Sequence, residues 1–164
     1  MAIATGMLLV PICLDPLCRM SSSAQGIYSL ISNISSFTTY PDIIFELKKM
    51  DIETSVRVLE KCLKELKVKN KTATMDEIVF SLKECIIEIE QQLSIIHEKM
   101  AFNQTVKYFQ YFRTFKLYEY INNLKILNEQ LKNRKQLFFE VVAANNNLEK
   151  DNEKINIDLD MSLL

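Results

Sequence analysis

Residues 81–100 read SLKECIIEIEQQLSIIHEKM, and this stretch decides the fold class. Apolar residues recur through it at steps of three and four, which is the spacing of one face of an α-helix. Glutamates occupy the outward positions, so the pattern predicts a helix with one buried and one acidic face. The buried seam consists of Ile78, Leu82, Cys85, Ile89, Leu93, Ile96 and Met100.

The same spacing predicts two more long helices on either side of this stretch. One runs from Asp42 to about Lys67, and the other runs to about Ala144, with Arg134 as the exception in its seam. Both have an apolar face that needs a partner, which favours helices packed together. The first seam is Phe45, Ile52, Val56, Leu59, Leu63 and Leu66. The second is Leu117, Tyr120, Leu124, Leu127, Leu131, Phe138 and Val141.

Local signals set the expected helix ends. Three serines at 21–23 can cap a helix over about 24–37, and Pro41 suits the first turn of the next helix. Thr74 and Glu77 have the spacing of a capping box. A break is expected near Phe102, and the polar residues after 144 are typical of a linker.

Glycine and proline usage excludes most β-rich folds. The chain of 164 residues has two glycines and three prolines, and none of them lies beyond Pro41. We therefore expect an all-α fold, an antiparallel bundle of four to five helices over residues 1–144. It would include a short apolar N-terminal arm or helix at 1–20, and 145–164 would form a polar linker or tail.

Residues suited to catalysis or metal binding are sparse. The four cysteines have no CxxC spacing, and His97 is the only histidine. A zinc site would need nearly all of them from unrelated positions, so we expect free thiols that behave as small core residues. His97 is expected to pack or to cap a helix. No catalytic residue, metal or cofactor is predicted, and the chain is not expected to be an enzyme.

The N-terminal residues MAIATGMLLVPICLDPLC are apolar but interrupted by Pro11 and Asp15. The run is too short to cross a bilayer as a helix and lacks a basic leader. We interpret it as an amphiphilic arm or short helix, while a cleaved signal peptide stays open.

Residues 102–124 carry eight aromatic residues and begin a basic segment. Between Lys99 and Lys135 lie eight basic and two acidic residues, a local charge of +6 in a chain whose net charge is −1. Three interpretations compete for it. Phe109, Phe112 and Phe115 can be core, with the cations solvated outside. The segment can face anionic lipid, or it can stack single-stranded nucleic acid, which the overall acidity disfavours.

The order of these pieces resembles the HeLo-like helical bundles. That group includes the N-terminal four-helix domain of mixed-lineage-kinase-domain-like proteins, plant RPW8-type domains and the N-terminal domains of many fungal NLR-like receptors. The likeness covers roughly residues 1–143. It rests on the arm, the short helix, the helix from Pro41, SLKECIIEIEQQLSIIHEKM, the corner VKYFQYFRTFKLYEYINNL and the last helix LKILNEQLKNRKQLFFEVV. In this last part Ile121, Leu124, Leu131 and Phe138 follow the family's spacing.

The resemblance implies a signalling module of cell-death or immune-type responses, usually the front part of a larger protein. Such a module would be cytoplasmic, form homo-oligomers on activation and bind or permeabilise anionic membranes, with no nucleic-acid partner. Downstream domains of the same chain are possible partners, and a non-membrane protein-protein interaction scaffold is the alternative. The candidate lipid-binding residues are Lys99, Lys107, Arg113, Lys116 and Lys125. The candidate membrane-inserting residues are Met7, Leu8, Leu9, Val10, Ile12 and Leu14.

Overall fold

The computed structural model describes residues 16–65, 72–106 and 110–161, and these ranges contain five α-helices and no strand. The all-α bundle predicted from the sequence is therefore confirmed. The candidate membrane-inserting residues between Met7 and Leu14 lie outside the described residues, as does Lys107. The helices are α1 (Pro16–Ser35), α2 (Pro41–Met50), α3 (Ile52–Glu65), α4 (Ala73–Thr105) and α5 (Gln110–Met161).

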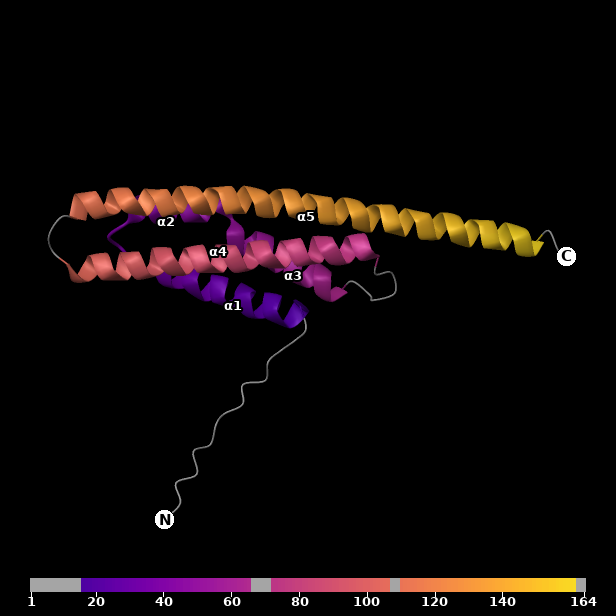
Figure 1. Cartoon of the computed structure of the whole chain (residues 1–164), viewed down its shortest axis with the longest axis horizontal. Helices are drawn as coiled ribbons and strands as arrows, with labels where there is room; N and C mark the ends of the chain where they lie inside the picture. Colours follow the sequence, from indigo (N-terminus) through magenta and orange to yellow (C-terminus); the bar gives the residue numbers. More distant parts are fainter. Residues whose placement is uncertain (1–15, 66–71, 107–109, 162–164) are drawn as a thin grey trace, which may run out of the picture.

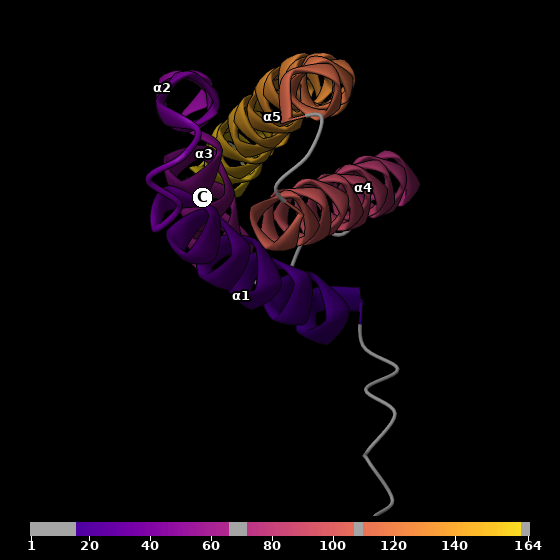
Figure 2. The same ribbon diagram turned by 90° about the vertical axis from the view of Figure 1, so that its left-hand side faces the viewer.

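The five helices form four columns, because α2 and α3 follow one another along the same side of the bundle (Figures 1 and 2). Contacts run from α4 to both α1 and α5, from α1 to α2 and α3, and from α5 to α2 and α3. Columns that are consecutive in the chain run in opposite directions, as the antiparallel prediction requires (Figure 1).

Two pairs of neighbouring columns are nevertheless parallel: α1 with α4, and α2–α3 with α5 (Figure 1). The Phe37 ring lies 5.6 Å from the His97 ring. Further toward the beginning of both helices, a Cβ added to Gly26 would come within 1.9 Å of Glu90 Oε1. Rising residue numbers in α1 therefore meet rising numbers in α4. The absence of a side chain at Gly26 lets the Glu90 side chain lie over the α1 backbone.

The core runs along the axis shared by the four columns. All seven residues of the seam in α4 are buried, which confirms that prediction, and Leu117, Leu124, Leu131 and Phe138 of α5 are also buried. Cys85 is a buried free thiol, and His97 packs on Phe37 as expected of a core-edge residue. The largest fully buried side chains are Phe138, Met20, Ile27, Ile34, Ile43, Ile52, Leu59, Leu82, Ile86, Ile89, Leu93 and Ile96.

The single helix predicted over 42–67 is wrong, because the chain breaks at Asp51 into α2 and α3. Asp51 adopts the left-handed conformation, with φ 50° and ψ 40°. Asp tolerates this region better than most residues. The Met50 carbonyl is held by Asn128 of α5, whose Nδ2 donates to it over 3.0 Å. The break changes the face that α2 presents, so Phe45, predicted to be buried, is 66% exposed.

Four other boundaries differ from the sequence expectations. α1 begins at Pro16 rather than near residue 24, so the serines at 21–23 lie inside the helix and do not cap it. Thr72, not Thr74, caps α4, because its hydroxyl accepts the Met75 amide over 3.2 Å. The expected break near Phe102 does not occur, and α4 continues to Thr105.

The helix expected to end near Ala144 continues to Met161. Loss of apolar residues does not stop a helix when no glycine or proline follows and the polar residues include helix-forming Glu and Lys. The segment after 144 is thus helical as far as Met161 rather than an irregular linker, and the yellow end of α5 projects past α4 (Figure 1).

Candidate functional site

Most described cations of the basic segment already have a partner in the protein. Lys125 Nζ lies 2.6 Å from Glu46 Oε2 and joins α5 to α2. The hydrogen bond from Lys125 lowers the pKa of Glu46 below its ordinary value. Arg134 Nη1 donates to the Ser81 carbonyl over 2.6 Å, so this exception in the α5 seam binds backbone on α4. Because of these contacts, Lys125 and Arg134 are less available to an external anionic ligand.

Two more cations of α5 have partners, one on α5 itself and one on α3. Lys132 Nζ lies 2.7 Å from Glu129 Oε1, and Lys135 Nζ donates to the Ser55 hydroxyl over 3.4 Å. Four of the six basic residues whose side chains the structure describes in this segment are therefore already engaged by protein groups.

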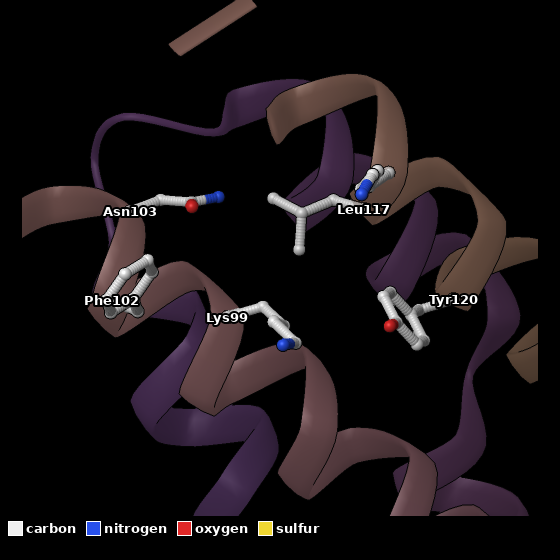
Figure 3. Close-up of a pocket in the computed structure, with 6 residues that line it drawn as sticks. Lys99, Phe102, Asn103, Leu117 and Tyr120 are labelled. Carbon is white, nitrogen blue, oxygen red and sulfur yellow. The ribbon is translucent and has the colours of Figure 1, made fainter. Parts of the chain in front are cut away.

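Lys99 and Lys116 differ from the others, because they come together at the end of the bundle where α4 ends and α5 begins. They line a pocket of about 260 Å³ between the two helices. Its other lining residues are Phe102, Asn103, Leu117 and Tyr120. Figure 3 shows the Asn103 side chain directed across the gap toward Leu117, with Lys99 lying between α4 and Tyr120.

The pocket combines a covered floor with a charged rim. Asn103 and Leu117 are buried, with 5% and 1% of their surface exposed, whereas Phe102 is 59% exposed. Lys99 and Lys116 are exposed, and neither belongs to an ion pair within the described part of the chain. None of its described lining residues carries a carboxylate. Such a site favours an anionic group beside an apolar one.

The remaining predicted lipid-binding residues are not brought to this pocket by the described structure. Lys116 and Lys125 are nine positions apart on α5. At about 100° per residue they lie on opposite sides of the helix. Arg113 lies one turn before Lys116 on the α5 backbone, and its side chain is outside the described part, as are those of Phe109, Phe112 and Phe115.

A second polar cluster, which the sequence analysis missed, joins α1 to α3 around Glu60. This carboxylate is only 8% exposed. Ser21 Oγ donates to Glu60 Oε1 over 2.6 Å, and the Tyr28 hydroxyl donates to Oε2 over 3.3 Å. Lys64 Nζ lies 3.0 Å from Oε1. The sequence showed only the Glu60–Lys64 spacing of one helical turn, because the other partners come from α1.

The cluster shifts the pKa values of Glu60 and Tyr28. Burial alone would raise the pKa of the Glu60 carboxyl, but the hydrogen bonds from Ser21, Lys64 and Tyr28 and the charge of Lys64 lower it below 4.5. Burial raises the pKa of Tyr28 to about 12, and the charge of Glu60 and its hydrogen bond act in the same direction.

Replacing Glu60 with glutamine is expected to lower the free energy of unfolding by about 1–2 kcal/mol at pH 7. Because the folded-state pKa is below the unfolded value of 4.5, the charged carboxylate stabilises the fold above pH 4.5. This stabilisation is lost as the pH falls through the lower, folded-state pKa. The difference in unfolding free energy between wild type and Glu60→Gln should therefore be smaller at pH 3 than at pH 7. Urea unfolding at the two pH values measures it.

Glu65→Gln is the control for this titration, since Glu65 is 67% exposed on the same helix and lies 3.9 Å from Lys61. It is expected to change the unfolding free energy by less than about 0.5 kcal/mol at either pH. If Glu60→Gln lowers the unfolding free energy equally at both pH values, the lowered pKa assigned to Glu60 would be contradicted.

Metal and thiol chemistry finds little support in the described residues. Burial raises the pKa of the Cys85 thiol, which lies 3.5 Å from the Leu127 carbonyl oxygen. Cys62 is half-buried. Within residues 16–65, 72–106 and 110–161, no three His, Cys, Asp or Glu side chains are grouped closely enough to hold a metal ion.

None of the helices in these ranges combines the length and the apolar content needed to cross a membrane. Comparisons with known proteins give no relative: no family model, curated protein or solved structure matches the chain. The class defined by the fold is an all-α helical bundle.

Proposed function

We propose that this bundle is a non-enzymatic signalling module that binds anionic membranes at the end where α4 and α5 meet. Its resemblance to the HeLo-like group favours a role in cell-death or immune-type responses. In this proposal the protein is cytoplasmic until activation, then forms homo-oligomers and reaches the membrane. The N-terminal arm, including Met7, Leu8, Leu9, Val10, Ile12 and Leu14, would insert.

The observation that carries this proposal is that two exposed lysines, which form no ion pair with any described residue, lie beside an exposed aromatic side chain. Lys99 and Lys116 line one pocket with Phe102, which is 59% exposed. Near an anionic leaflet each lysine contributes about 1 kcal/mol of attraction. An exposed ring beside the cations can enter the headgroup region, where amphipathic side chains are stabilised.

The test is co-sedimentation of the full chain with two kinds of liposome, one containing anionic lipid and one containing only neutral lipid. Lys99→Glu combined with Lys116→Glu is expected to reduce binding by at least about tenfold, because two attractive charges become repulsive. The matched control is Lys48→Glu with Lys61→Glu, two exposed lysines on α2 and α3. It has the same net charge and should bind nearly as well as wild type.

Equal loss in both double variants would mean that net charge alone governs binding, and the assigned pocket would be wrong. Dye release from the same liposomes tests the arm separately. Removing residues 1–14 should abolish release while leaving sedimentation largely intact. Release that is unchanged by the truncation would remove the arm from the mechanism.

A protein-interaction scaffold is the second candidate, favoured by the number of large apolar side chains that face solvent on α2 to α5. Helical partners could bind such faces. A folded chain that does not sediment with anionic liposomes would support this alternative. The most exposed of these side chains are Phe45, Phe80, Phe102 and Ile126.

A further inference from the structure

The contact between the beginning of α1 and α3 includes a short hydrogen bond to the buried carboxylate of Glu60. Ser21 Oγ donates to Glu60 Oε1 over 2.6 Å, and Ser21 lies in the second turn of α1. On either side of it Met20 and Ala24 are buried, with 2% and 0% exposed. The serine hydroxyl is therefore a donor that the carboxylate needs, at a place where α1 begins to pack.

We propose that Ser21 is a phosphorylation site and that a phosphoryl group on it opens the contact between α1 and α3. A protein kinase would transfer the terminal phosphoryl group of a nucleoside triphosphate. A bond forms between Ser21 Oγ and phosphorus, the bond to the leaving diphosphate breaks, and the hydroxyl proton passes to a base. Arg19, two residues before Ser21, gives the serine a basic neighbour of the kind that many serine kinases recognise.

The chemistry of the site makes the modification disruptive rather than stabilising. The ester oxygen can no longer donate to Glu60, and the phosphate brings a charge of about −1.5 to −2 beside a carboxylate that is already negative. Like charges in a partly buried site repel strongly, because the effective dielectric constant is well below that of water.

Two cations on α3 beside this contact already have partners. Lys64 is already bound to Glu60 and is 65% exposed. Arg57 is paired with Glu53 and lies over the Tyr28 ring, 5.3 Å from its centre. Tyr28 itself is a donor to Glu60. Lys64 and Arg57 are thus already paired with carboxylates of α3 before the phosphate arrives.

Opening would free the first turns of α1. This inference deepens the proposed function, because release of the N-terminal arm is the step that the membrane mechanism requires. The opening of α1 itself does not depend on membranes, so it can be tested without them.

The main experiment is hydrogen–deuterium exchange on the full chain carrying phosphoserine at position 21. Exchange of the amides from Met20 to Tyr28 is expected to be at least about tenfold faster than in the unmodified chain. Ser21→Asn is the neutral control. It should change the exchange rate of these amides by no more than about threefold, because the asparagine side-chain amide can still donate to Glu60. The amides from Cys85 to Ile96 in α4 should stay protected in all three proteins.

Glu60→Gln in the phosphorylated chain supplies the decisive second variant. It removes the repulsion and places an amide donor beside the phosphate, so exchange in α1 should return to within about threefold of that in the unphosphorylated Glu60→Gln chain. Phosphoserine that exchanges no faster than Ser21→Asn, or a failure of Glu60→Gln to restore protection, would overturn the proposal. Accelerated exchange in α4 would also overturn it, since the whole bundle would then be unfolding.

Incubation of the chain with ATP and a serine kinase that prefers upstream arginine tests the site assignment. Mass spectrometry should find phosphate on Ser21, at a higher rate in Glu60→Gln, where the hydroxyl is held less tightly. Phosphate confined to Ser22 or Ser23 would overturn the assignment. An opened chain that still fails to bind anionic liposomes would support the Ser21 contact and contradict the proposed membrane function.

Discussion

Replacing Phe138 with alanine is expected to lower the free energy of unfolding by about 3–5 kcal/mol. Phe138 is fully buried and is the largest of the fully buried side chains. Its removal leaves a cavity between α5 and the rest of the core that the surrounding helices fill only in part. Urea unfolding followed by circular dichroism measures the change.

Phe139 provides the matched control at the next position. It is 38% exposed, and its ring meets that of Phe138 edge to face, with centroids 5.4 Å apart. Phe139→Ala should lose only this ring contact and part of its burial, about 1 kcal/mol. Equal losses in the two variants would mean that α5 is not oriented with Phe138 toward the core.

Replacing Asn128 with aspartate is expected to cost at least about 2 kcal/mol at pH 7. Asn128 is 2% exposed, and its Nδ2 donates to the Met50 carbonyl over 3.0 Å. An ionised carboxylate cannot donate, so the variant leaves that carbonyl unpaired and buries a negative charge beside it. The amide orientation is well defined, because turning it over would face two acceptors toward each other.

The loss in Asn128→Asp should shrink as the pH falls, because a protonated carboxyl can donate to the Met50 carbonyl. Asn122→Asp on the exposed face of the same helix is the control and should cost less than about 0.5 kcal/mol. Urea unfolding at pH 7 and pH 4 compares the two. A cost in Asn128→Asp that grows on acidification would show that Asn128 does not act as a donor.

The helices with long uninterrupted seams could be predicted from the sequence, whereas the break at Asp51 could not. In α4 the apolar spacing alone identifies the buried face, because the helix packs along most of its length on α1 and α5. At Asp51 neither glycine nor proline marks the break. Asn128, which holds the carbonyl of Met50 beside this break, is 78 positions away from Met50 in the chain.

The candidate site was predictable in part for a similar reason. Composition pointed to a basic segment, and Lys99 and Lys116 were among its candidates. Which cations are free depends on acceptors from other helices, such as Glu46 for Lys125 and Ser81 for Arg134. Single-sequence spacing does not show those partners. The aromatic residues between 108 and 115 suggested the location but not the pocket.

The uninterrupted course of α5 fixes the number of residues in its bundle-facing half. Each inserted or deleted residue would rotate everything after it by about 100° and shift it by about 1.5 Å. Leu117 and Phe138 are both buried on the same continuous helix. A change in length between them would move one of the two out of phase with the core. Evolution can therefore substitute residues in this segment far more readily than it can insert or remove one.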